Sequence, residues 1–217
     1  MSQLENKKHL IYILGTFAFF LFTIADTIIK LIGDLYKDTV IFSIASFSAI
    51  IPVCIYLLYR KSLEEIKTKN YKLHIVRGIL MTLTYYFIVK GIILLPLSIA
   101  YPIILSAPVL LSVLGILVLK ESINLSKIIS LVLAMSAVFL VSGFSLKVGF
   151  NAQGVLFLVL GVVAVACLDF SVRVSGKNER TVALTFYSML FTGSIFFIFS
   201  INHFSNIFLK DFLIMVC

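Results

Sequence analysis

Charged residues divide this chain into long apolar stretches. Seven of them are long enough to cross a lipid bilayer as helices, which takes about 20 apolar residues. They cover residues 10–29, 39–59, 78–95, 96–119, 128–146, 148–168 and 181–209. Membrane-spanning strands would instead be about 10 residues long, with alternating polarity. The pattern therefore predicts an all-α fold: a polytopic transmembrane helix bundle of about seven helices.

Composition excludes a water-soluble protein. Of the 217 residues, 61% are hydrophobic and 13% are charged, whereas about a quarter of the residues in an ordinary globular domain are charged. The chain has too little polar surface to cover itself in water, so lipid is its expected solvent. The first apolar stretch is longer than the core of a typical signal peptide and is followed by further spans, so we expect it to be retained as the first helix.

Lysine and arginine residues alternate between the two sides of the predicted membrane layer. Loops on one side carry 13 of the 18, and loops on the other side carry 5. Cytoplasmic loops of membrane proteins carry the excess of basic residues, so the first side is predicted to be cytoplasmic, with the N-terminus on it. The net charge of +8 thus indicates topology and loops near anionic lipid, and no nucleic-acid partner is expected.

The chain contains an internal repeat. An offset of 143 residues aligns four pairs of similar side chains, and the repeated unit holds five predicted helices. A unit with an odd number of helices re-enters the membrane upside down, which gives the inverted repeats typical of secondary transporters. Two complete units need more residues than the sequence has, so we expect a fragment, a truncated gene or a half-site component that lacks three helices of the second unit. The matched pairs are Asp26 and Asp169, Lys30 and Arg173, Gly33 and Gly176, and Lys37 and Arg180.

Ionisable side chains within the predicted spans are the first candidates for a functional site. Asp26 and Lys30 lie four residues apart on one face of the first helix, and Asp169 and Arg173 repeat the pair after the sixth span. One interpretation is an ion pair at the helix end, with the long cation reaching the interface. The other is a carboxylate that faces the bundle interior and binds a substrate cation or relays a proton. The sequence leaves both open.

The third helix carries a polar and aromatic stripe. Thr82, Tyr86 and Lys90 follow one another at four-residue intervals, with Tyr85 beside them. Such a stripe on an otherwise apolar helix favours contact with a cavity. Lys90 either extends to the membrane surface or points inward, where it would hold an anionic group.

The fourth helix begins at Pro96 and contains Pro102 and Pro108. Each interior proline leaves a carbonyl without its helical donor. Breaks of this kind are tolerated where neighbouring helices or water satisfy the backbone. The helix is therefore predicted to line a cavity or act as a hinge, with simple kinked packing as the alternative. Tyr101 is a further polar candidate on it.

No catalytic, metal or cofactor site is expected. The three histidines lie near span ends, and no serine, cysteine or aspartate has a base at a useful spacing. The three cysteines are scattered, which suggests neither a disulfide framework nor a metal site. The sequence also has no glycine-rich phosphate loop. These observations favour a function other than catalysis.

Segments from most of the chain resemble the EamA branch of the drug/metabolite transporter superfamily. They are FTIADTIIKLIG in the first helix, VRGILMTLTYYF and LLPLSIAYPIILSAPVLLSVLGILVLKES in the third and fourth, and DFSVRVSGKNERTVALTFYSMLF in the sixth and seventh. Members of this branch are ten-helix proteins made of two inverted five-helix repeats. The resemblance implies a first EamA-like repeat at 10–146 and an incomplete second repeat at 147–217, after the N-terminus at residues 1–9 that the basic loops place in the cytoplasm.

The resemblance further implies a secondary transporter that moves a small organic metabolite across the bacterial inner membrane. The Asp-x-x-x-Lys first helix is similar to that of S-adenosylmethionine uptake carriers, so this metabolite or a related one is the expected substrate. The expected partners are the metabolite and the lipid bilayer, with a homodimer left open. An inactive membrane remnant of such a carrier and an intramembrane enzyme are kept as alternatives. The candidate substrate-binding or cavity-lining residues are Asp26, Lys30, Thr82, Tyr85, Tyr86, Lys90, Tyr101, Pro102 and Asp169.

Overall fold

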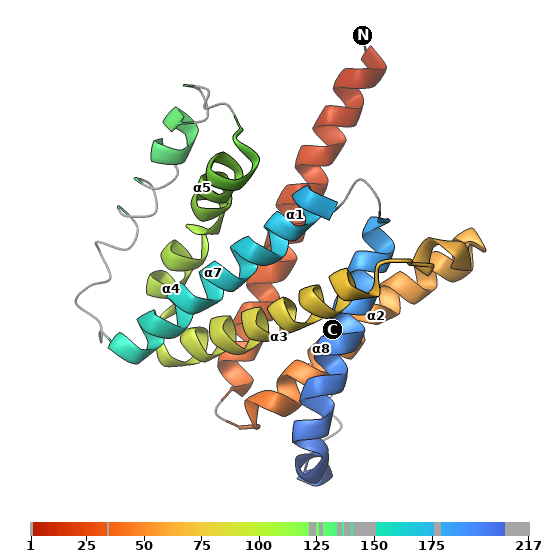
Figure 1. Ribbon diagram of the computed structural model, residues 1–217. Helices are drawn as coiled ribbons and strands as arrows, with labels where there is room; N and C mark the ends of the chain where they lie inside the picture. The colour runs from red at the N-terminus through yellow and green to blue at the C-terminus, as the bar shows by residue number, and fades with distance from the viewer. Residues whose placement is uncertain are drawn as a thin grey trace.

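A computed structural model describes residues 2–33, 35–121, 125, 128–133, 136, 140, 151–175 and 179–206. These residues form helices and the connections between them, with no strand among them (Figure 1). The elements defined in this part of the chain are α1 (Ser2–Ile32), α2 (Asp38–Arg60), the 3-10 helix η1 (Leu63–Ile66), α3 (Tyr71–Leu94), α4 (Leu97–Ile104), α5 (Ala107–Leu119), α7 (Ala152–Ser175), α8 (Thr181–Ser200) and the 3-10 helix η2 (Ile201–Asn206).

Six segments of the described chain are long and apolar enough to cross a membrane, and α4 and α5 together count as one of them. They are Tyr12–Ile32, Asp38–Arg60, Tyr71–Leu94, Leu97–Leu119, Ala152–Val174 and Thr181–His203. These segments correspond to six of the seven predicted spans. The other predicted span, 128–146, lies mostly outside the described residues. The predicted fold class, an all-α polytopic transmembrane bundle, is confirmed.

Four helices differ from their predicted bounds by seven residues or more. α1 begins at Ser2, eight residues before its predicted start. α3 begins at Tyr71, seven residues before the predicted start, and α7 continues to Ser175, past its predicted end. The prediction ended spans at charged residues, but Arg77 and Arg173 stay helical because they have partners on other parts of the bundle. α8 ends earlier than predicted, at Ser200, where η2 follows.

Prolines interrupt the fourth span, as the sequence predicted. α4 ends at Ile104 and α5 begins at Ala107, with Pro108 in its first turn. Proline lacks the N–H that would bond the carbonyl four residues earlier, and its ring crowds that carbonyl. The hydroxyl of Ser106 donates to the carbonyl of Ile103 at 2.6 Å, so the break retains a hydrogen-bonded turn.

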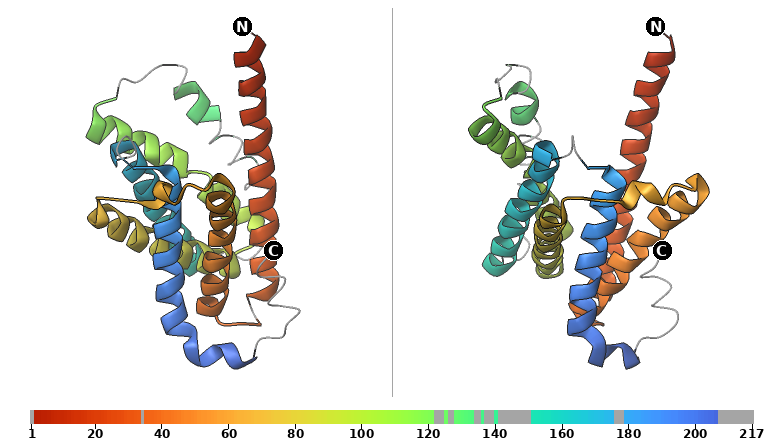
Figure 2. Two further views of the ribbon diagram at one scale, coloured as in Figure 1. Left: turned by 90° about the vertical axis from the view of Figure 1, so that its right-hand side faces the viewer. Right: turned by 45° about the vertical axis from the view of Figure 1, so that its right-hand side comes forward.

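α3 is the central helix of the described bundle. It packs along α7 and α8 and also contacts α1, α2 and α4 (Figures 1 and 2). Glycines permit the close contact with α7, because a Cβ added to Gly91 would collide with Leu158, and one added to Gly154 would collide with Leu95. Small residues let helices approach closely in membranes. The end of α3 thus lies against the start of α7.

α2 and α8 form the second long helix pair and run antiparallel. Phe42 near the start of α2 contacts Phe196 near the end of α8, with ring centroids 4.7 Å apart. At the other end of the pair, Tyr56 of α2 lines one groove with Thr181 of α8. The repeat offset of 143 residues moves Asp38–Arg60 onto the span Thr181–His203. The two helices that the repeat aligns are therefore packed against each other in opposite directions.

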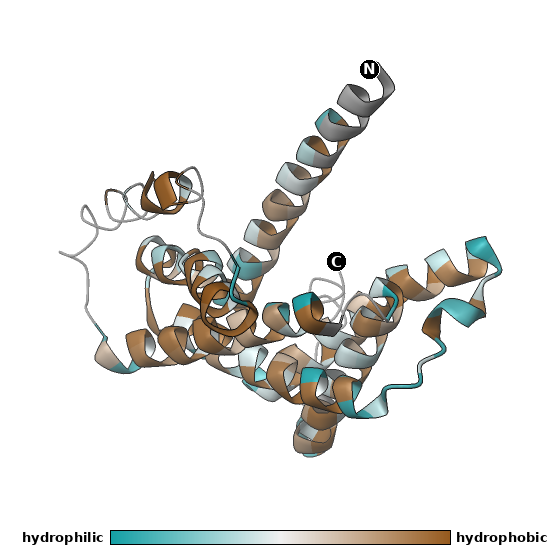
Figure 3. Cartoon of the chain, turned by 45° about the horizontal axis from the view of Figure 1, so that its top comes forward, coloured by the Kyte–Doolittle hydropathy of each residue, from teal (hydrophilic) through white to brown (hydrophobic). Residues whose placement is uncertain are grey.

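α1 projects from the rest of the bundle (Figure 3). The large apolar side chains of Leu10 and of residues from Tyr12 to Ile24 are exposed, and the last turn of α1 reaches the core at the buried Ile32. Hydrophilic residues, drawn in teal, gather at helix ends and in the connection between α2 and α3 (Figure 3). An exposed apolar surface of this length is unfavourable in water and favourable in hydrocarbon, so α1 is suited to a bilayer.

Candidate functional site

Asp26 of α1 and Tyr101 of α4 form a polar contact within the membrane-spanning part of the bundle. The Tyr101 hydroxyl donates a hydrogen bond of 2.9 Å to Asp26 Oδ2. Tyr85 of α3 lies within electrostatic range of the same carboxylate. Pro102, next to Tyr101 in the chain, is buried in α4. Three helices thus converge on one carboxylate, and four of the predicted site residues lie in this region.

Lys30, one turn after Asp26, caps the end of α3. Its ammonium nitrogen donates to the backbone carbonyls of Ile92, Ile93 and Leu95 at 2.7, 2.6 and 2.9 Å. Carbonyls at the end of a helix lack an intrahelical donor, and unsatisfied backbone groups are costly in lipid. Lys30 therefore supplies hydrogen bonds that the bilayer cannot, and it links α1 to α3.

Thr82 and Tyr86 of the α3 stripe contact two different helices. The Thr82 hydroxyl donates to the hydroxyl of Thr192 in α8 at 3.2 Å. Tyr86 lies beside Phe157 of α7, with ring centroids 6.3 Å apart, and remains partly exposed. Both side chains lie at helix contacts, and their role in substrate binding stays a prediction.

Lys90 forms an ion pair with Asp38, the first residue of α2. An acid in the first turn of a helix is favoured by the helix dipole, so Asp38 stabilises both α2 and the lysine. This partner explains how α3 carries a lysine one turn before its end, because intramembrane charges usually pair. An anion held by Lys90 would have to compete with Asp38 for the same ammonium group.

Asp169 lies near the opposite end of α3. It interacts electrostatically with Arg77 of α3 and with Arg173, one turn further along α7. Arg77 is buried, and its Nη1 donates to the carbonyl of Leu168 at 3.0 Å and to the hydroxyl of Ser171 at 2.6 Å. Asp169 therefore has two guanidinium groups near it. Asp26, with which the repeat aligns it, instead accepts a hydrogen bond from a tyrosine.

Arg173 also joins α7 to the end of α5. Its Nη1 lies 3.3 Å from Glu121 Oε1. Lys120 ends α5 in the left-handed conformation, with φ of 54°, and this turn brings the Glu121 backbone N–H to the carbonyl of Gly115 at 3.3 Å. The absence of a Cβ at Gly115 leaves room for the Glu121 and Arg173 side chains, which lie against it.

Sequence reasoning missed a buried polar cluster between the connection of α2 to α3 and the start of α8. Glu179 accepts a hydrogen bond of 2.9 Å from Thr68, and its other carboxylate oxygen lies 3.6 Å from His74 Nε2. Tyr187 contacts the His74 ring and donates to the carbonyl of Ile66 at 3.0 Å. The sequence did hold one signal for this cluster. In the prediction, His74 and Glu179 lie in two loops on the same side of the membrane.

The two acids that the repeat aligns lie toward opposite ends of α3. Lys30, one turn after Asp26, bonds to the last residues of α3. Arg77, near the start of α3, interacts with Asp169. α1 and α7 therefore bring equivalent segments of the repeat to opposite ends of one central helix.

Asp26 is the side chain whose surroundings suit reversible binding of a proton or a cationic group. A carboxylate among apolar helices can take up a proton or a cationic group, since either reduces the cost of its charge in lipid. Within the ranges that the structure describes, no group of three or more histidine, cysteine or acidic residues is arranged to hold a metal ion. Binding of a proton or a cation by Asp26 stays a prediction.

In the described part of the chain, six apolar segments with charged groups paired between them define a multi-pass membrane protein. The EamA-like transporter family matches residues 9–143, more than half of the sequence, so the chain belongs to this family. Proteins of the family are membrane transporters of small substrates. No curated protein and no solved structure matched the chain.

Proposed function

We propose that this protein is a secondary transporter that moves a small organic metabolite across the bacterial inner membrane by alternating access. The observation that carries the proposal is the Asp26 carboxylate, which lies within the spans and accepts a hydrogen bond from Tyr101. Ionisable residues within spans are rare and mark pathways for substrates, ions or protons. Membership of the EamA-like family supports transport as the activity.

Alternating access needs two halves of opposite orientation around one site. The antiparallel packing of α2 and α8, which the repeat aligns, supports this arrangement. The positions of Asp26 and Asp169 toward opposite ends of α3 support it as well. We assign residues 10–146 to the first repeat and 147–217 to the second, with the N-terminus in the cytoplasm.

Two aligned positions test this topology. In a variant without native cysteines, Lys37→Cys is expected to react with a membrane-impermeant thiol reagent in intact cells, and Arg180→Cys only after permeabilisation. Both native side chains are exposed at helix starts, so the reagent can reach them. Labelling of both positions from the same side would contradict the inverted arrangement and, with it, this form of alternating access.

The substrate we propose is S-adenosylmethionine or a related metabolite with a positively charged group. Asp26 offers it a negative charge, while the ammonium groups of Lys30 and Lys90 are already bound to carbonyls and to Asp38. This distribution of charge favours a cation over an anion. The proposal therefore combines the resemblance of the first helix with the pairing of the charges around it.

Uptake of labelled S-adenosylmethionine tests the substrate. Cells that express the protein are expected to accumulate label above cells with an empty vector, and excess unlabelled metabolite should compete. No accumulation, with the protein present in the membrane, would reject this substrate and direct the assay to other small cations. A protein that is inserted but transports none of them would favour the inactive remnant.

A further inference from the structure

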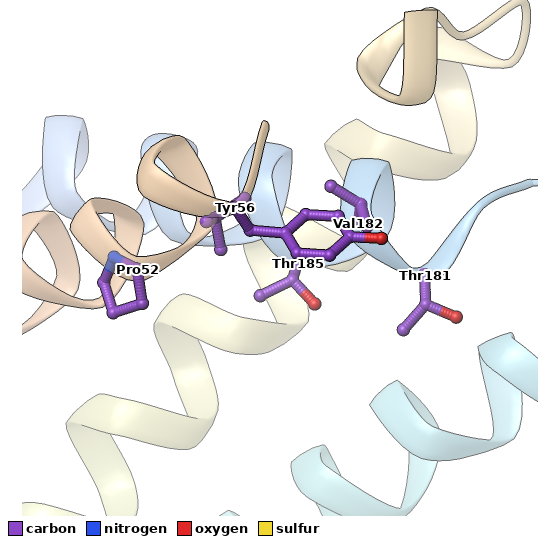
Figure 4. A pocket seen from close by; sticks show the side chains of 6 residues that line it. Pro52, Tyr56, Thr181, Val182 and Thr185 are labelled. Carbon is purple, nitrogen blue, oxygen red and sulfur yellow. The ribbon is translucent and has the colours of Figure 1, made fainter. Parts of the chain in front are cut away.

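A groove of about 300 Å³ opens between the second half of α2 and the start of α8 (Figure 4). It is separate from the Asp26 region, which involves α1, α3 and α4. The residues that line it are Pro52, Val53 and Tyr56 of α2 and Thr181, Val182 and Thr185 of α8.

The groove surface is almost entirely hydrocarbon. The ring of Tyr56 extends from α2 toward Val182 and Thr185 on α8 (Figure 4). Pro52 and Val53 continue the apolar wall along α2. Among the residues that the structure describes, neither an acid nor a side-chain amide contributes to the lining. The groove therefore matches a flexible apolar chain better than a polar metabolite.

Two cations stand at one end of the groove. The guanidinium carbon of Arg60 lies 5.9 Å from the centre of the Tyr56 ring. Arg180 directly precedes Thr181, and both arginine side chains are exposed. The nearby acid Glu64 is within electrostatic range of Arg180, but it is bonded to Lys67 at 3.0 Å. The groove thus combines an apolar channel with a positive end.

We propose that this groove binds one acyl chain of an anionic phospholipid, with the lipid phosphate at Arg60 and Arg180. Its positive end lies among the basic residues predicted to face the cytoplasm, where positive pockets between membrane helices bind lipid head groups. Tyr56 packs along the chain and offers its hydroxyl near the head group, as tyrosines do at membrane interfaces. The inference does not depend on which substrate, if any, the protein transports.

The sequence contains no tryptophan, so a single introduced tryptophan reports on its own surroundings. Tyr56→Trp places the reporter in the groove. Tyr59→Trp is the matched control, because Tyr59 lies one turn away on the same helix and is 86% exposed without lining the groove. Each purified variant is reconstituted in phosphatidylcholine with a small fraction of acyl-brominated phosphatidylglycerol or acyl-brominated phosphatidylcholine, and quenching is measured.

Brominated phosphatidylglycerol is expected to quench the Tyr56→Trp reporter with at least about fivefold preference over brominated phosphatidylcholine, which is the effect of one cation near an anionic lipid. Adding Arg60→Gln should lower this preference about fivefold, and adding the exposed Lys72→Gln should leave it unchanged. The Tyr59→Trp control should show little preference.

Three results would overturn the proposal. Equal quenching of Tyr56→Trp by the two lipids would show that the groove takes any acyl chain. A preference that survives Arg60→Gln would show that the arginine does not hold the phosphate. Quenching of Tyr59→Trp but not of Tyr56→Trp would show that protein, either a second copy or a further segment, fills the groove.

Discussion

Asp26→Asn is expected to lower substrate uptake at least tenfold while the amount of protein in the membrane stays unchanged. Asparagine keeps the size of the side chain and can still accept the hydrogen bond from Tyr101, but it removes the negative charge. The interaction that is lost is the one between the Asp26 carboxylate and the charged group of the substrate. A hydrogen bond to a charged group contributes about 1.5–3 kcal/mol, and about 1.4 kcal/mol corresponds to a factor of ten. The measurement is the initial rate of labelled-metabolite uptake, normalised to membrane protein.

Two variants control for effects other than the charge at this position. Asp26→Glu retains the carboxylate and should keep measurable uptake. Glu64→Gln removes an acid whose side chain is 76% exposed and should transport like the unmodified protein. If Asp26→Asn transports at the unmodified rate, Asp26 does not contact the substrate and the proposed site is wrong.

Arg77→Met is expected to destabilise the protein by about 3 kcal/mol, because it removes two charged hydrogen bonds between α3 and α7. The guanidinium donates to the Leu168 carbonyl and the Ser171 hydroxyl, and it also interacts with Asp169. Methionine replaces the apolar part of the side chain but supplies no donor. The measurement is thermal unfolding of the purified protein in detergent.

Lys72→Met is the matched control for this loss of charge. Lys72 is exposed in the first turn of the same helix, so its replacement should leave the melting temperature nearly unchanged. Arg77→Lys should lie between the two, because lysine keeps the charge but not the planar fork of donors. A melting temperature of Arg77→Met equal to that of the unmodified protein would show that Arg77 does not join α3 to α7.

The spans could be predicted from sequence because lipid imposes a length and an apolar composition on every crossing helix. Their ends could not, because the prediction placed most span boundaries at charged residues. Arg77 was assigned to a loop, yet it lies within α3, and its carbonyl partner at Leu168 is 91 residues away in the chain. Only the folded arrangement shows which charges have partners inside the bundle.

The same limit applies to the candidate site. The rarity of acids in apolar helices singled out Asp26, and the polar side chain of Tyr101 was noted separately, but no spacing rule relates positions 75 residues apart. The partners of Lys30 are backbone carbonyls, which every residue has, so sequence holds no signal for them. Whether these residues contact a substrate stays a prediction.

The hydrogen bonds at the two ends of α3 would behave differently during a transport cycle. Lys30 fastens one end of α3 to α1, and both helices belong to the proposed first repeat. Arg77 tethers the other end to α7, in the proposed second repeat. If one half moves as a rigid body against the other, the hydrogen bonds between Lys30 and α3 can stay intact. The hydrogen bonds between Arg77 and α7 must lengthen or break. The hydrogen bonds of Lys30 could then persist through the cycle, whereas those of Arg77 would break and re-form with each turnover.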